Sequence, residues 1–249
     1  VLQTLPAPGT APMGLAWDGG NLWCADLNSY TLYRLTDRIP SVITCQLSDA
    51  EIVFGEAVTV SGQISPVLGS AGEGVSIELL SPEGDTVYRA TLANINGEFS
   101  YTIQCEDLFM AGSWSVRTSW AGQGPYEGAQ SSQIPLSVAS ADTRTTLSLT
   151  SQAIKFGDFV SIGGKITPYP DCGRSLAGLP VELHLAGPNS TSETINVLTN
   201  DVWGHFTLQD TAAFDLLGEW TVTVQFPGTS GYASSVSSAS PSMGSTSSS

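Results

Sequence analysis

Four cysteines and two histidines are the residues of this chain best suited to redox, metal or nucleophilic chemistry. They are Cys24, Cys45, Cys105, Cys172, His184 and His205. The cysteines lack the close pairing of zinc or redox sites, and neither histidine lies near a cysteine in the sequence. No nucleophile elbow, zinc-protease helix, phosphate loop or dinucleotide fingerprint occurs. We therefore expect structural disulfides, solvated histidines, and no catalytic, metal or cofactor site.

The charge balance argues against several classes of partner. Lysine and arginine number 8 against 23 aspartates and glutamates, a formal net charge of −15. Nucleic acids and anionic membranes are bound by clustered basic side chains, so neither is expected as a partner. No apolar run approaches the roughly 20 residues that span a bilayer. No signal peptide is visible, as in a secreted chain whose signal has been removed, and the even cysteine count favours an extracellular location.

The strongest pattern is an internal repeat. The segment 54–66, FGEAVTVSGQISP, matches 156–168, FGDFVSIGGKITP. Three further matched blocks follow in the same order, and the last aligns Trp114 with Trp220 and Tyr126 with Tyr232. Ordered blocks of this kind indicate two copies of one structural unit.

Within each copy the apolar residues recur at every second position, as in 75–79, VSIEL. Short alternating runs broken by Gly, Pro, Asn and Asp predict antiparallel strands with one buried face. The matched blocks resemble the Ig-like modules found in tandem in large bacterial and archaeal surface proteins. The resemblance covers 41–249 and implies an all-β fold of two tandem Ig-like β-sandwiches, at 41–140 and 141–249. It specifies the fold rather than an activity.

Residues 1–40 follow a different pattern. Three short strands are expected there, with 18–20 as a hairpin turn. The stretch 12–35 resembles one blade of the propellers built from P-x-G-L-A-W-D-G-x-x-L-W repeats, although one blade cannot close a ring. This blade-like element is expected to be either the end of a longer propeller or a docking element packed on the first sandwich. Its apolar face needs a cover; that face comprises Leu15, Trp17, Leu22, Trp23, Leu32 and Tyr33.

The last strand of the second copy falls in a serine-rich tail. Alignment on the two tyrosines places Ser240, Ser242 and Gly244 on the first copy's apolar strand 134–138. Without core-facing side chains this strand would leave a groove and an unpaired edge. One hypothesis is donor-strand complementation by the apolar N-terminus of another chain. The alternatives are a serine-rich strand that still pairs through its backbone, or a chain that stops within the domain.

Strand counting favours one of the three possible cysteine pairings. The strand near 98–104 ends at the pole where the chain leaves the first sandwich, which places Cys105 beside the second. Cys172 lies in a loop of the second copy that faces the first. A Cys105–Cys172 disulfide would therefore staple the two sandwiches, and Cys24–Cys45 would tie the blade-like element to the first strand. Free buried thiols are the alternative.

Two further features could serve binding. Trp114 and Trp220 align between the copies and are expected in the cores. Trp203, in a loop without an aromatic counterpart, is the better candidate for a contact surface, although packing is the simpler expectation. Asn189-Ser190-Thr191 is a glycosylation sequon, which makes Asn189 a candidate glycan site.

Two classes of function fit these observations. The first is a structural subunit of an extracellular filament, stalk or surface layer, assembling head to tail with further copies of itself or with other surface proteins. Its assembly residues would be Val1, Leu2, Leu5, Trp17 and Trp23. The second is an adhesin, carbohydrate-binding or spacer module of a larger secreted protein, with glycans as ligands near Trp203 or 167–180. A self-filled second sandwich would favour the second class. An enzyme is not expected.

Overall fold

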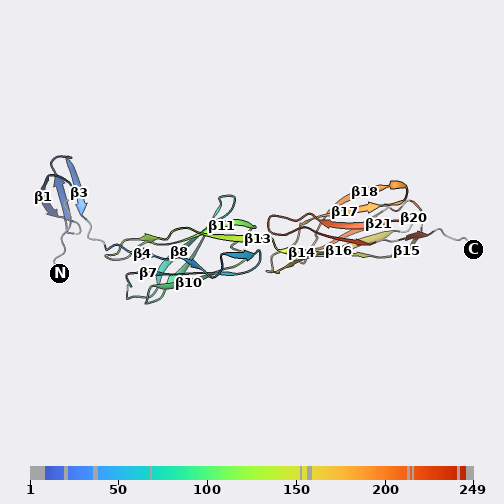
Figure 1. Ribbon diagram of the computed structural model, residues 1–249, viewed down its shortest axis with the longest axis horizontal. Helices are drawn as coiled ribbons and strands as arrows, with labels where there is room; N and C mark the ends of the chain where they lie inside the picture. Colours follow the sequence, from blue (N-terminus) through green and yellow to red (C-terminus); the bar gives the residue numbers. More distant parts are fainter. Residues whose placement is uncertain are drawn as a thin grey trace, which may run out of the picture.

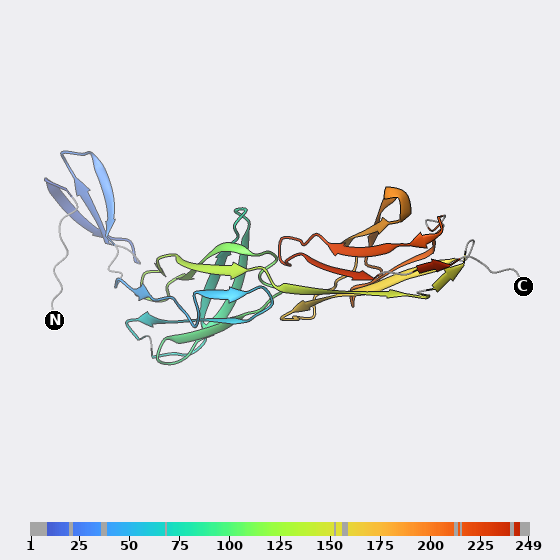
Figure 2. The same cartoon turned by 45° about the vertical axis from the view of Figure 1, so that its right-hand side comes forward.

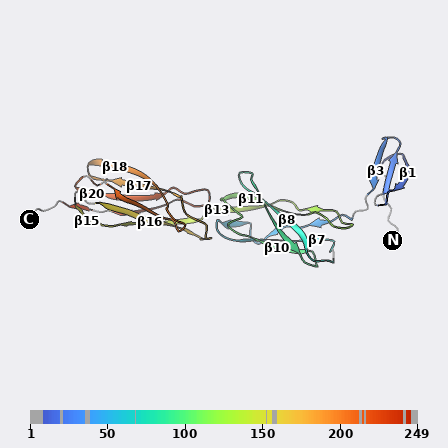
Figure 3. The same cartoon turned by 180° about the vertical axis from the view of Figure 1, so that it is seen from behind.

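The computed structural model describes residues 9–19, 22–35, 39–67, 69–151, 153–155, 159–211, 214, 216–239 and 242–244. A small N-terminal sheet and two β-sandwiches follow one another in a row (Figure 1). The three parts keep the same order in a row when the molecule is turned and when it is seen from behind, so the arrangement is a rod (Figures 2 and 3). The described residues form no α-helix, and no helix among them is long and apolar enough to cross a membrane.

The N-terminal sheet is an antiparallel meander of β1 (Pro12–Trp17), β2 (Leu22–Asp26) and β3 (Thr31–Leu35). The buried carboxylate of Asp26 accepts hydrogen bonds from the backbone N–H groups of Ala11 and Ser29, both at 2.8 Å. These donors favour the ionised form and hold the pKa of Asp26 below its ordinary value. One carboxylate thus fastens the chain before β1 to the turn after β2.

The apolar face of this sheet is open in the single chain. The register divides the six expected residues between the two sides of the sheet: Leu15, Trp17, Leu22 and Tyr33 share one side, whereas Trp23 and Leu32 lie on the other. Leu15 and Trp17 are both 66% exposed and Leu32 is 61% exposed, while Leu22, Trp23 and Tyr33 are half-buried. Of the two alternatives for this element, the one in which the first sandwich covers these side chains is therefore wrong. The assembly candidates Val1, Leu2 and Leu5 lie outside the described residues.

The first sandwich consists of two sheets. One has the order β10-β7-β4 with β5 also on β7, and the other runs β6-β13-β11-β8-β9 with β12 on β11. The bounds are β4 Val42–Ile43, β5 Gln46–Leu47, β6 Glu51–Val53, β7 Val58–Ser65, β8 Glu73–Leu80, β9 Thr86–Ala93, β10 Glu98–Ile103, β11 Gly112–Trp120, β12 Ala129–Gln130 and β13 Ile134–Ala139. β6 runs parallel to β13, so the first-strand region contributes to both sheets.

The second sandwich repeats this topology. Its sheets have the orders β14-β16-β19, β18-β17-β21-β22 and β15-β23-β20. The bounds are β14 Asp142–Leu149, β15 Ala153–Lys155, β16 Val160–Tyr169, β17 Pro180–Ala186, β18 Ser192–Leu198, β19 His205–Thr211, β20 Gly218–Glu219, β21 Thr221–Phe226, β22 Ser235–Ala239 and β23 Ser242–Gly244. A 3-10 turn, Pro188–Ser190, joins β17 to β18. The parallel pair β15–β23 corresponds to β6–β13.

The two cores are built around equivalent tryptophans. Trp114 and Trp220 are both buried, and each indole N–H donates to the carbonyl four residues earlier, at 3.1 and 3.0 Å. A phenylalanine meets each indole edge to face, Phe109 in the first sandwich and Phe214 in the second. The alternating pattern of the sequence therefore gives the two Ig-like β-sandwiches expected of it.

The second sandwich pairs its sheets with its own last strand, contrary to the donor-strand hypothesis. β22 pairs with β21, and β23 pairs with β15 and β20. Met243 lies opposite Gly218 as Val138 lies opposite Gly112. Ala239 lies opposite Val222 as Ile134 lies opposite Val116.

The expectation failed because the connection from Tyr232 to this strand is one residue shorter than the connection from Tyr126 to its counterpart. A one-residue shift moves every side chain to the other face of the sheet. Ser242 and Gly244 therefore do not replace Leu136 and Val138. β22 and β23 therefore take the backbone pairing positions that the last strand occupies in the first copy.

Candidate functional site: the junction between the sandwiches

The last strand of the first sandwich and the first strand of the second are joined by two residues, Ser140 and Ala141. Ala141 is 0% exposed. Its N–H donates to the carbonyl of Gly231 at 3.0 Å, and its carbonyl accepts from the N–H of Ala233 at 2.8 Å. The linker is therefore hydrogen-bonded like a strand, which restricts its backbone dihedrals.

A pair of aromatic rings joins the two cores. Phe54, at the end of β6, is 2% exposed, and its ring meets that of Tyr232 edge to face with the centroids 5.4 Å apart. Tyr232 packs against the buried clusters of both sandwiches. The guanidinium of Arg174 lies 5.7 Å from the centroid of the Phe54 ring, within cation–π range. Phe54 is thus clasped by two side chains of the second sandwich.

Two glycines permit this close approach. A Cβ on Gly231 would lie 2.7 Å from the Phe54 ring, closer than real contacts allow. Gly55 has a φ of +106°, which disfavours other residues, and a Cβ there would lie 3.0 Å from the carbonyl oxygen of Pro170. A hydrogen bond from the N–H of Ala111 to the carbonyl of Ser230, 2.7 Å long, adds a backbone contact between the sandwiches.

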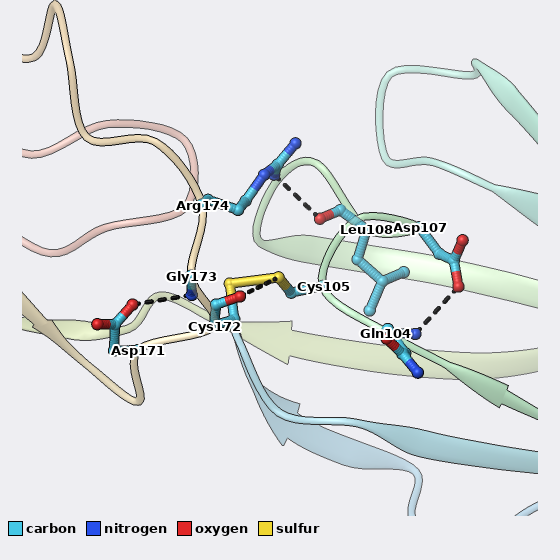
Figure 4. The surroundings of a disulfide bond; sticks show 8 residues. All are labelled: Gln104, Cys105, Asp107, Leu108, Asp171, Cys172, Gly173 and Arg174. Carbon is cyan, nitrogen blue, oxygen red and sulfur yellow. Dashed lines mark hydrogen bonds between the residues drawn. A yellow bond between two sulfur atoms is a disulfide. The ribbon is translucent and has the colours of Figure 1, made fainter. Parts of the chain in front are cut away.

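The structure joins Cys105 to Cys172 by a disulfide with the Cα atoms 6.2 Å apart. Cys105 follows β10 of the first sandwich and Cys172 follows β16 of the second (Figure 4). This is the pairing that strand counting favoured. Beside it, Arg174 donates to the carbonyl of Leu108 at 3.3 Å. The covalent bond and the aromatic contact hold the same two poles together.

A buried carboxylate positions the loop that carries Cys105. Asp107 accepts from the guanidinium of Arg89 at 2.5 Å, from the hydroxyl of Tyr101 at 3.1 Å and from the N–H of Gln104 at 3.0 Å. Burial, followed by this hydrogen bond to Asp107, raises the pKa of Tyr101, and the same carboxylate raises that of Arg89. Three donors therefore converge on one carboxylate next to the disulfide.

The second expected disulfide, Cys24–Cys45, is absent, and both residues are free thiols. Cys24 is buried in β2 of the N-terminal sheet, whereas Cys45 packs against the first core between β4 and β5. Burial raises the pKa of the Cys45 thiol. Strand counting located the two residues at neighbouring elements but carried no information on which side of a strand each thiol takes.

The other sequence candidates lie away from the junction. Asn189 is exposed at a positive φ of 58°, in the turn after β17. Trp17 is exposed, whereas Trp23 is half-buried with its indole donating to Asp18. Within the described ranges no group of three or more His, Cys, Asp and Glu side chains could hold a metal ion.

Sequence reasoning missed the aromatic part of the junction. Phe54 opens the repeated FG motif and Tyr232 is one of the aligned tyrosines, so both were visible as repeat markers. Their contact across the junction had no separate sequence pattern. A useful indication would have been the small residue Gly231 beside an aligned tyrosine, since its first-copy counterpart is larger.

No protein-family model matches the chain, and no curated protein is detectably similar to it. Among solved structures, the chain resembles a tetra-tandem repeat in the extending region of a large adhesion protein, with a TM-score of 0.53 and 15% sequence identity. The match covers 90% of this chain and 55% of that one, so the chain spans about half of that structure. Fibronectin(III)-like modules of Clostridium thermocellum CbhA match with a TM-score of 0.30 and 10% identity, over 82% of this chain and 94% of theirs.

Proposed function

We propose that the chain is a stiff spacer in the extracellular part of a surface or adhesion protein, and that it is not an enzyme. The junction carries this proposal: a disulfide, a buried linker residue and a clasped aromatic ring all act against bending between the sandwiches. If the angle between the two sandwiches is fixed, the rod keeps the domains attached to its two ends at a constant distance from each other.

Two observations support the extracellular setting. A disulfide between domains persists in an oxidising compartment and is rare in reducing ones. The fold is that of a repeat from an adhesion protein, which is similar to this chain in architecture. We further propose that Asn189 carries a glycan where the host cell glycosylates sequons, since its side chain is exposed in a turn.

The spacer role is tested by measuring the distance distribution between the sandwiches. Spin labels would be attached through maleimide at Leu92→Cys and Leu198→Cys, both exposed, in a chain that also carries Cys24→Ser and Cys45→Ser. We expect one narrow distance peak, and a broader one when Cys105→Ser and Cys172→Ser are added. A broad distribution with the disulfide intact would refute a stiff spacer.

A second candidate function, self-association, is favoured by the open face of the N-terminal sheet. Leu15 and Trp17 present an apolar surface on one side of this sheet that a second copy could cover. Sedimentation of the full chain beside a Trp17→Asn variant tests it. Association that weakens in the variant supports assembly through this sheet, and a monomer at every concentration removes this function.

A further inference from the structure

A second surface, which adjoins the junction and shares Arg174 with it, combines an exposed indole with charged side chains. A hollow of about 100 Å³ in the second sandwich is lined by Lys165, Pro168, Asp171, Val202 and Trp203. Trp203 is 65% exposed, and no acceptor for its indole N–H lies among the described residues. In contrast, the indoles of Trp114, Trp120, Trp220 and Trp23 all donate to acceptors.

The loop that presents Trp203 is fixed in place. Asp201 accepts from the N–H groups of Trp203 and His205, both at 3.0 Å, and lies 2.7 Å from the imidazole of His205. The bond from His205 lowers the pKa of Asp201 and keeps it ionised. On the other wall, the N–H of Leu176 donates to the carbonyl of Val202 at 3.1 Å. The ring is therefore held ready on a preorganised surface.

The repeat shows that Trp203 is not needed to build this loop. In the first copy, Asn94 accepts from the N–H groups of Asn96 and Glu98 at 2.9 and 3.0 Å, as Asp201 does in the second. The glycines that follow have φ values of +78° and +81°. Asn96 thus occupies the place of Trp203 in a loop of the same geometry.

The same comparison applies to the charge opposite the loop. Gln63 lies opposite Glu98 in the first copy, and Lys165 lies opposite His205 in the second. Gln63 donates to the carbonyl of Asn96, whereas the ammonium of Lys165 has no partner among the described side chains. In the first copy the amide of Gln63 is hydrogen-bonded within the loop. In the second copy an exposed indole and an ammonium group stand in place of Asn96 and Gln63.

The chemistry of these groups selects among ligands. The flat C–H face of a pyranose ring packs on an indole, and sugar hydroxyls both donate to a carboxylate such as Asp171 and accept from an ammonium such as Lys165. The hollow is well below the roughly 300 Å³ that encloses a drug-sized ligand, so it takes one substituent while the rest of the ligand lies on the surface. A peptide strand is disfavoured, because β16 is already paired on both sides.

We propose that Trp203, Lys165 and Asp171 form a binding site for a surface-lying oligosaccharide. The test is calorimetric titration of the whole chain with tetrasaccharides of glucose, of N-acetylglucosamine and of galacturonate. We expect at least one to bind with a Kd near or below about 1 mM, and Trp203→Asn to weaken it by about tenfold or more. Lys165→Gln should weaken it by a smaller factor, and Trp203→Phe should retain most of the binding.

Trp203→Asn and Lys165→Gln introduce the residues of the first copy, so the loop is expected to fold in both. Ile95→Asn, which removes an exposed apolar side chain from the first copy's loop, is the matched control and should bind as the parent does. No binding by any of the three probes at about 10 mM, or binding unchanged by Trp203→Asn, would overturn the proposal. So would Trp203-dependent binding of an acidic hexapeptide without any saccharide binding. The distance measurement on the spacer is independent of every one of these outcomes.

Discussion

The ring of Phe54 in the first sandwich and the ring of Tyr232 in the second meet edge to face, at an interplanar angle of 88°. Edge-to-face pairs of this kind contribute about 0.5–1.5 kcal/mol beyond the area they bury. The contact depends on the absence of a side chain at Gly231 and lies beside the disulfide-linked loops.

Gly231→Ala should loosen the junction while leaving both cores folded. The added methyl would lie 2.7 Å from the Phe54 ring, so that ring or the loop must move. Overpacking of this kind costs about 1–3 kcal/mol. Denaturant unfolding measures the cost, and the spin-label distances report the loosening. Gly74→Ala, where nothing lies within 4 Å of the new methyl, is the control. Equal behaviour of the two variants would contradict the role given to Gly231.

Asp107→Asn should expose the disulfide to reductant. The neutral amide is a weaker acceptor for Arg89 and cannot serve its three donors as the carboxylate does, so the loop holding Cys105 loses its anchor. Hydrogen bonds to charged groups each contribute about 1.5–3 kcal/mol. The rate of Cys105–Cys172 reduction, followed by mass spectrometry, should rise several-fold. The neighbouring exposed Glu106→Gln should leave that rate unchanged.

The half-buried phenol of Tyr232 should lower the free energy of unfolding at alkaline pH. Burial raises the pKa of its phenol above the ordinary value of 10.0, while the nearby cation of Arg174 partly opposes this. At a pH between the ordinary pKa of 10.0 and the raised pKa of the folded protein, the unfolded chain has lost the phenol proton while the folded chain still holds it. The protonated phenol's contribution to the free energy of unfolding is therefore complete below pH 10, and it declines as the pH rises through the folded pKa.

Tyr232→Phe removes this ionisation. The difference in free energy of unfolding between the parent and this variant should be constant up to about pH 10 and then shift in favour of the variant. Denaturant titrations at pH 8 and pH 11 measure it. Tyr88→Phe, at an exposed position, should follow the parent at both pH values. Parallel curves for Tyr232→Phe and the parent would show that the phenol ionises alike in both states.

The thiol count separates the two possible states of the N-terminal cysteines. In denaturant without reductant, a maleimide should add to two cysteines, Cys24 and Cys45, and to four after reduction. In the native protein both should react slowly, because Cys24 is buried and the raised pKa of Cys45 leaves little thiolate. Failure to label any cysteine before reduction would mean that these two form a bond.

The fold was accessible from sequence because its main determinant is local. Alternation in 75–79 and the aligned Trp114 and Trp220 report burial directly, and each core is built around its own copy of that pattern. The Cys105–Cys172 pairing also followed, since the poles of a seven-stranded sandwich are set by counting strands. The disulfide inference needs only the direction in which the chain runs through each strand.

Features that depend on register or on tertiary contact were not accessible. The last strand was misassigned because one residue fewer after Tyr232 shifts its alternation, and composition does not show such a deletion. Serine also disguised the pairing: Ser235 bonds the hydroxyls of Thr143 and Thr145, and backbone hydrogen bonds complete the strand. The Phe54–Tyr232 contact joins residues 178 positions apart by number, a separation about which local patterns carry no information.

The glycine at position 231 also gives the rod a direction. Its counterpart in the first copy, one residue before the aligned tyrosine, is Pro125. A side chain at position 231 would begin with a Cβ 2.7 Å from the Phe54 ring, so the proline of the first copy does not fit the contact made here. The two modules share one architecture yet are not interchangeable. The order of the two modules along the chain therefore matters to the contact between Phe54 and Tyr232, which requires a residue without a side chain at position 231.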